Sequence, residues 1–252
     1  MLFRSVSQSR YRGGSISNGP IVGYNTVIKA DIVKIFSSII FEGTWCIEDV
    51  KAAWFGVSQT AEDNTNFINN AFKCCWSTRS RILTFHTGIF KIKGIVVIGN
   101  KERNGWDIII KGSGANQYFG TTFVMEAGSY FYGGMENYNY GQQRSGAIID
   151  CCFTGGDTKG KGIVLDFCQT YDICRCNFQR LESGITLTGS AYFVKINSCR
   201  FLDCTYAVRT LKNGDELYKE GGANNNQIDS CFFYYNEHPI DIQEGGMWHV
   251  IS

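Results

Sequence analysis

The sequence predicts an all-β solenoid, and three observations carry that prediction. A short motif, I-x-x-C-x-F, occurs four times, at residues 148–153, 173–178, 196–201 and 228–233. The copies lie 25, 23 and 32 residues apart, and periods of 20–50 residues are typical of solenoid proteins. Glycine is frequent (29 residues) and proline is rare (2 residues) in a chain with many short apolar runs, a pattern that favours strands and turns.

The motif itself predicts a buried corner. Its Cys and Phe are two residues apart, so they share one face of a strand. Its Ile and Cys are three apart, so both face inward only if the backbone bends between them. The residue before each Cys is polar, as a corner requires: Asp150, Arg175, Ser198 and Ser230. Two stacked internal ladders follow, Cys151, Cys176, Cys199 and Cys231, and Phe153, Phe178, Phe201 and Phe233.

The length of one coil is set by a second repeat. Residues 162–183 align with residues 184–205, and both open with Gly-Ile-x-Leu, which gives 22 residues per coil. An insertion at about 212–225 explains the spacing of 32. The L-x-x-L-x-L framework of leucine-rich repeats is not found. Three short strands per coil therefore predict a parallel β-helix with coils ~4.8 Å apart.

The front of the chain differs from the repeats. Residues 1–27, rich in Ser, Gly and Arg, are interpreted as an extended or disordered arm, either for attachment or merely solvated. Residues 28–59 are lead-in strands, and residues 60–252 form the β-helix, whose last coil is expected to be incomplete. Apolar residues at helical spacing predict a helix at about 64–77, starting near Asp63–Thr65. We expect it to cap the first coil.

The segment 52–92 resembles the opening of the pectate-lyase-like β-helix family. The matching residues are Trp54, Phe55, Gly56, Asp63, Thr65, Ala71, Phe85, Gly88 and Phe90. The resemblance implies a right-handed parallel β-helix, in a family that includes bacteriophage tailspikes, polysaccharide depolymerases and bacterial polysaccharide lyases and hydrolases. The lead-in at 38–57 is most similar to the phage tailspike type. It also implies a homotrimer with its helices side by side. The matching residues are structural and imply nothing about catalysis.

Composition excludes several classes of partner. The 24 Lys and Arg balance 23 Asp and Glu, so no basic footprint for nucleic acid is present. No apolar stretch approaches the ~18 residues that span a bilayer. The eleven cysteines have no zinc-finger spacing, and no acidic cluster suggests calcium. We expect buried free thiols and no metal or cofactor.

Candidate catalytic residues come from the repeat alignment, because the sequence motifs of the family's enzymes are missing. Four residues after each ladder Phe lie Asp157, Glu182, Thr205 and Glu237. Asp157 and Glu182 would be one coil apart, near the ~5 Å of a retaining pair of carboxylates, and Glu182 and Glu237 ~10 Å apart, at the upper limit for inversion. Glu182 and Glu237, assisted by Asp203, are the predicted catalytic residues. The alternative is that these acids are solvated turn residues.

Candidate carbohydrate-binding residues are aromatic or lie on a second outward row. The aromatic ones are Tyr234, Tyr235, Trp248 and the segment 129–140. The outward row contains Asp172 and Lys195, whose simplest interpretation is an exposed ion pair between coils.

These features predict a tailspike-type virion protein, assembled in the host cytoplasm. It would bind a host surface polysaccharide, which it would hydrolyse if it is an enzyme, and dock on other virion proteins through its arm. Two alternatives stay open. One is a purely structural virion β-helix, and the other is a fragment of a bacterial polysaccharide lyase or hydrolase.

Overall fold

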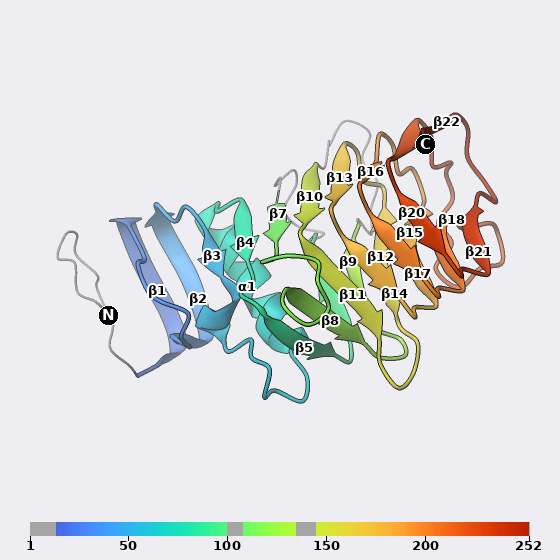
Figure 1. Ribbon diagram of the computed structural model, residues 1–252. Helices are drawn as coiled ribbons and strands as arrows, with labels where there is room; N and C mark the ends of the chain where they lie inside the picture. The colour runs from blue at the N-terminus through green and yellow to red at the C-terminus, as the bar shows by residue number, and fades with distance from the viewer. Residues whose placement is uncertain (1–13, 100–107, 135–144, 252) are drawn as a thin grey trace.

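The structure, a computed structural model, describes residues 14–99, 108–134 and 145–251. The described chain is mostly β-strand with one α-helix. Its strands form three long parallel sheets that run along the length of the molecule (Figure 1). The expected parallel β-helix is therefore confirmed.

Each coil from β4 to β21 contributes one strand to each sheet, and β22 adds a last strand to sheet 1. Sheet 1 contains β3 (Val50–Lys51), β4 (Ile82–Thr84), β7 (Ile108–Lys111), β10 (Gly146–Ile149), β13 (Tyr171–Cys174), β16 (Lys195–Asn197), β19 (Asn226–Asp229) and β22 (Trp248–Ile251). Sheet 2 contains β5 (Gly88–Ile92), β8 (Thr121–Met125), β11 (Cys151–Gly155), β14 (Asn177–Gln179), β17 (Arg200–Leu202) and β20 (Phe232–Tyr234). Sheet 3 contains β6 (Ile95–Val97), β9 (Tyr130–Gly133), β12 (Lys161–Asp166), β15 (Ser183–Thr188), β18 (Tyr206–Thr210) and β21 (His238–Asp241).

The strand register confirms the predicted repeat. On sheet 3, Ile163 pairs with Ile185 and Leu165 pairs with Leu187, so these coils are offset by 22 residues as the alignment predicted. The predicted insertion at 212–225 is the long loop between β18 and β19. It folds back over sheet 3, where Thr188 Oγ1 donates to Leu217 O at 3.2 Å.

The predicted corner between sheets 1 and 2 is a single left-handed residue in four successive coils. These residues are Asp150, Arg175, Ser198 and Ser230, with φ of 59°, 51°, 53° and 51°. L-residues adopt the left-handed conformation at single positions only. One such residue turns the chain from sheet 1 into sheet 2, and no longer loop is needed. The motif's Ile and Cys consequently both face the interior.

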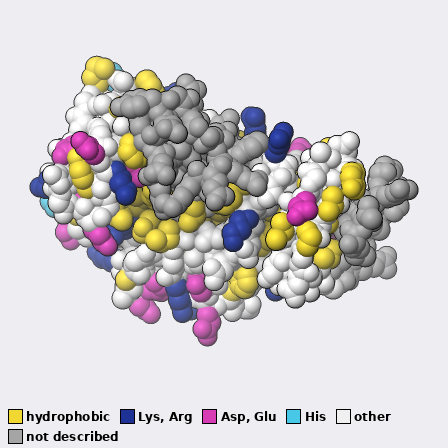
Figure 2. All heavy atoms as spheres, turned by 180° about the vertical axis from the view of Figure 1, so that it is seen from behind, with side chains coloured by type: hydrophobic (Ala, Val, Ile, Leu, Met, Phe, Trp, Pro, Cys, Tyr) yellow, Lys and Arg dark blue, Asp and Glu magenta, His cyan; other side chains and the backbone are white. Residues whose placement is uncertain are grey.

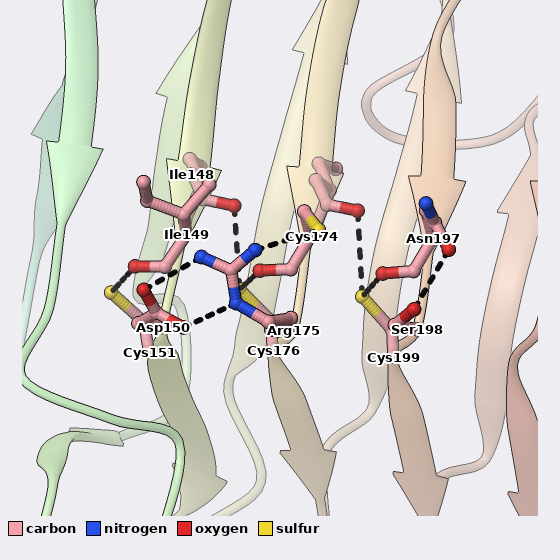
Figure 3. Close-up of polar contacts among 11 residues, drawn as sticks. Ile148, Ile149, Asp150, Cys151, Cys174, Arg175, Cys176, Asn197, Ser198 and Cys199 are labelled. Carbon is pink, nitrogen blue, oxygen red and sulfur yellow. Dashed lines mark hydrogen bonds and ion pairs between the residues drawn. The ribbon is translucent and has the colours of Figure 1, made fainter.

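The cysteine ladder lies directly inside this corner (Figure 3). The Cys176 thiol is within hydrogen-bonding distance of the Ile148 carbonyl in the preceding coil (3.4 Å), and Cys199 is 3.5 Å from that of Ile173. Burial raises the pKa of the Cys151 and Cys176 thiols. All eleven cysteines are free, so the ladder is one of thiols. Eight of the eleven are buried, but the expectation of burial is wrong for Cys46, which is exposed, and for Cys174 and Cys231, which are half-buried.

The phenylalanine ladder forms the centre of the core. Adjacent rings from Phe153 to Phe233 are stacked 5.0–5.2 Å apart at 6–8°. The ladder continues towards the N-terminus through Phe123, 5.2 Å from Phe153. Each fully buried Phe contributes roughly 1.5–3 kcal/mol of hydrophobic free energy.

The first coil is covered by the predicted helix, α1 (Thr65–Thr78). It packs against β2, β3, β4, β6 and a 3-10 helix, η1 (Ala52–Phe55). The N-cap residue is Asn64, whose side chain makes no capping hydrogen bond. Asp63 Oδ1, one residue earlier, accepts the Thr65 backbone N–H at 2.9 Å. Burial raises the pKa of the Asp63 carboxyl, but hydrogen bonds from Thr65 and Lys93 outweigh it, and the net pKa is lowered.

A two-stranded parallel sheet precedes this cap. It consists of β1 (Ile16–Thr26) and β2 (Phe36–Trp45). Strand β1 lies within the segment predicted as the arm, and β2 and β3 lie within the predicted lead-in. Residues 1–13 lie outside the described residues, so an attachment role for the arm stays a prediction.

Candidate functional site

The outer face of sheet 2 carries aromatic side chains on its last described strand. Phe233 faces inward and stacks on Phe201, and alternation along the strand therefore places Phe232 and Tyr234 outward. Both are exposed, by 58% and 46%, and the corner residue Tyr235 is exposed by 75%. Leu202, in register with Tyr234 on β17, is exposed by 36%. We name Phe232, Tyr234, Tyr235 and Leu202 the aromatic platform.

The platform's rings contact one another. The Phe232 and Tyr234 ring centroids are 6.0 Å apart at 19°, and those of Tyr234 and Tyr235 are 3.9 Å apart. The side-chain hydrogen bond to Tyr235 raises the pKa of the Tyr234 hydroxyl. Asn236, next along the chain, is held by bonds to Cys204 N and Phe201 O. The Asn236 side chain therefore ties the end of the aromatic segment to the preceding coil.

The predicted catalytic acids begin just beyond the platform, at the corner between sheets 2 and 3. Asp203 occupies this corner, with φ of 53°. Tyr206 N donates to Glu182 O at 2.9 Å, and His238 N donates to Thr205 O at 2.8 Å, so Glu182, Thr205 and Glu237 succeed one another on adjacent coils. Two coil steps separate the two glutamates, ~10 Å along the solenoid.

The two glutamates differ in their surroundings. The Glu182 carboxylate lies 3.0 Å from Lys161 Nζ on the preceding coil. Glu237 is exposed, and among the described residues no ion pair involves it. Asp203 is also exposed. The corner thus presents three carboxylates on the side of the aromatic platform.

The expected pairing of Asp157 with Glu182 is wrong. Glu182 N donates to Gly160 O at 2.9 Å, and Lys161 pairs with Ser183. Gly160 therefore occupies the position expected for Asp157. The reason is that the turn after β11 is longer than those after β14 and β17, and it displaces Asp157 from the row of acids.

The remaining predicted binding residues lie on sheet 1 and not on the platform. Asp172 pairs in register with Lys195, and Lys195 with Gln227, as the second outward row predicted. Among the residues that the structure describes, however, no ion pair joins Asp172 to Lys195. Trp248 begins β22 and is half-buried beside Asn226.

The aromatic segment at 129–140 is described only to residue 134. Tyr130 and Tyr132 lie on β9 in sheet 3 and are half-buried, with ring centroids 6.2 Å apart. The Tyr132 hydroxyl donates to buried Asp166 at 2.9 Å. Burial and the Asp166 charge raise the pKa of this hydroxyl. Tyr132 is thus half-buried and paired with a buried carboxylate, and residues 135–140 of the segment lie outside the described residues.

Sequence reasoning missed Phe232, which occupies a position that is polar in the neighbouring coils. The register equates Asn177, Arg200 and Phe232. Alignment of the repeats could have identified Phe232, because it is an aromatic residue at an outward position where the neighbouring coils have Asn177 and Arg200. Sequence reasoning also gave no role to Tyr118 and Phe119, which are both strongly exposed.

Other kinds of site receive no support from the described residues. They contain no group of three or more His, Cys, Asp or Glu side chains placed to hold a metal ion. No helix among them is long and apolar enough to cross a membrane. On the face opposite to that of Figure 1, Figure 2 shows Lys and Arg side chains interspersed with acidic ones, and no large patch of one charge.

Comparison with known proteins gives one distant structural likeness. No protein-family model matches the sequence. No curated protein matches it. Among solved structures, the chain is similar to ORF18 of Geobacillus virus E2, with a TM-score of 0.48 and 16% sequence identity. The match covers 81% of this chain and 47% of that one, so this chain spans about half of that protein's length.

Proposed function

We propose that this protein binds a host cell-surface polysaccharide as a tailspike-type virion protein. The observation that carries the binding proposal is the aromatic platform. Its rings are exposed, held by a rigid sheet, and bordered by Arg200, Asp203 and Glu237, which can hydrogen-bond hydroxyl groups. Amphipathic aromatic rings with polar groups at their edges suit the apolar faces and hydroxyl rims of sugars.

The platform is not part of the protein's own core, for a geometric reason. Its side chains project from the outer face of sheet 2, whereas the core ladder uses the inner face. A further coil stacked on β20 would cover Phe233 but leave Phe232 and Tyr234 projecting outward. Phe232 and Tyr234 would therefore stay exposed even with a further coil stacked on β20, and this favours a ligand-binding role for them.

The virion setting is the second part of the proposal, and it comes from the sequence resemblance. The lead-in at 38–57 resembles that of tailspike-type β-helices, and the N-terminal arm would then dock on other virion proteins. We further propose that three copies associate side by side.

Hydrolysis is the catalytic extension of this proposal. Glu182 and Glu237 lie on the same side of the solenoid two coils apart, with Asp203 beside them. One carboxylic acid would protonate the leaving glycosidic oxygen while the other carboxylate takes a proton from the attacking water. The C–O bond breaks as water adds to the anomeric carbon, and the ~10 Å separation leaves room for that water, which favours inversion.

A polysaccharide array with reducing-end detection tests both parts. We expect the wild type to bind at least one bacterial surface polysaccharide, and the combined variant Phe232→Ala, Tyr234→Ala, Tyr235→Ala to lose that binding. Tyr24→Ala, an exposed aromatic on β1, is the matched control and should bind normally. Binding that survives loss of the platform would refute this site.

Cleavage is tested separately from binding. Glu182→Gln and Glu237→Gln should each abolish the release of reducing ends and leave binding intact, while Glu42→Gln on β2 should have no effect. If both variants cleave like the wild type, the acids are solvated turn residues. If the wild type binds and cleaves nothing across the array, a purely structural virion β-helix becomes the better description.

A further inference from the structure

A second exposed aromatic group lies on the loop between β7 and β8. In the next four coils one left-handed residue connects sheets 1 and 2, but here residues 112–120 form a loop. Tyr118 and Phe119 on this loop are exposed by 74% and 79%. With Tyr235 of the platform, they are the three most exposed large hydrophobic residues in the described chain.

The loop is held in one conformation by its own hydrogen bonds. Asn116 Oδ1 accepts the backbone N–H groups of Tyr118 at 2.9 Å and Phe119 at 3.1 Å. Gly120 N donates to Asn116 O at 2.9 Å. A Cβ on Gly120 would lie 2.0 Å from Gly114 O, so the loop closes tightly on itself. The two rings are therefore presented to solvent by an ordered support.

The loop lies against the outer face of sheet 2, the face that carries the platform. Thr122 flanks inward-facing Phe123 on β8, and its hydroxyl donates to Gln117 O at 3.0 Å. Thr122 also begins the row that ends at the platform. The register runs from Thr122 through Cys152, Asn177 and Arg200 to Phe232. Four strand steps separate its ends, ~19 Å along the solenoid.

The side chains between the two aromatic groups are suited to a polar polymer. Of the side chains between them on this row, Cys152 is buried, Asn177 is half-buried and Arg200 is exposed. Asn177 and Arg200 offer hydrogen-bond donors. A protein interface typically has a contiguous apolar centre, whereas here a polar stretch separates two aromatic groups. A sugar chain, with apolar ring faces and hydroxyl rims, matches this alternation better than a second copy of the protein does.

We infer that Tyr118 and Phe119 form a distal contact for the same polysaccharide, which lies along sheet 2 parallel to the solenoid axis. This inference rests on the proposed binding function and extends it from a local platform to an elongated site. It restricts the ligand class to a polymer, because only a chain longer than ~19 Å reaches both aromatic groups at once.

The test compares fragments of different length. The polysaccharide that binds the wild type most strongly in the array is fragmented and sized into pools of extended length below and above ~19 Å. Affinities of both pools are then measured by calorimetry. The variant Tyr118→Ala, Phe119→Ala should weaken the long pool about tenfold or more and leave the short pool unchanged. Tyr118→Phe, Phe119→Tyr keeps both rings and should bind both pools like the wild type.

Each other outcome overturns the inference in a recognisable way. Unchanged affinity of the alanine variant for the long pool removes the distal contact. If the alanine variant binds both pools more weakly by the same factor, the substitutions act on the platform or on the fold and not on a distal contact. A change of oligomeric state in light scattering, without a change in affinity, makes the loop a subunit contact. Failure of the wild type to bind any arrayed polysaccharide refutes the proposed function itself, and the inference with it.

Discussion

Replacing Phe178 by alanine is expected to remove a large fraction of the protein's stability. The Phe178 side chain is fully buried and stacks between Phe153, at 5.2 Å and 6°, and Phe201, at 5.0 Å and 8°. Truncation of a buried Phe costs about 3–5 kcal/mol, because apolar surface is lost and a cavity remains. The cost falls on two coil interfaces at once, since a solenoid is stabilised by contacts between neighbouring repeats. Domains are typically stable by only about 5–15 kcal/mol.

Urea unfolding followed by tryptophan fluorescence and far-UV circular dichroism measures this loss. Phe178→Leu, which retains most of the apolar volume, should cost less than about 1.5 kcal/mol. Phe232→Ala is the matched control from the outer face of the same sheet, and it should change stability by less than about 0.5 kcal/mol. A loss below about 1 kcal/mol for Phe178→Ala, or an equal loss for Phe232→Ala, would contradict the assignment of inner and outer faces.

Four further predictions follow from the same structure. Gly184→Ala should destabilise the protein by about 2 kcal/mol or more, because its Cβ would lie 2.6 Å from Ala207 O; a normal melting temperature would contradict this. Arg175→Gln should cost at most about 1 kcal/mol, because the Arg175 side chain that pairs with Asp150 at 2.8 Å is 56% exposed. The hydrogen bond from Arg175 lowers the pKa of Asp150, so this contribution should be present above about pH 4 and disappear as the pH falls further. Burial raises the pKa of Cys152 and Cys204 to about 11, so the free energy of unfolding should decline as pH rises from about 8.5 towards 11, where unfolded thiols ionise and folded ones do not. Light scattering at low salt should find a trimer, and a stable monomer would refute the proposed association.

The repeat made the fold readable from the sequence. The motif spacing identified the ladders, the polar corner residues and the 22-residue coil, because stacking forces equivalent positions of successive coils into contact. The helix over the first coil was also predictable, since its apolar residues recur with helical spacing. These features depend on local periodicity, and the described structure confirms them.

The residues that make up the proposed binding surface could not be predicted from the repeat period alone. Asp157 does not lie in the row of acids next to Glu182, where the alignment predicted it to be. The turn after β11 is longer than the turns after β14 and β17 and displaces this carboxylate. The predicted binding residues separated onto two sheets, with Tyr234 and Tyr235 on the platform and Asp172 on sheet 1. Only the strand register shows which of them share a surface.

The sequence by itself determined the architecture, the inward residues and the four corner residues between sheets 1 and 2. The tertiary structure decided which exposed side chains lie together. Thr122, which holds the loop that carries Tyr118, and Phe232 are far apart in the chain, and four strand steps place them in one row on the outer face of sheet 2. The physical reason is that burial is encoded by local alternation, whereas a surface site is assembled from turns whose lengths differ between coils.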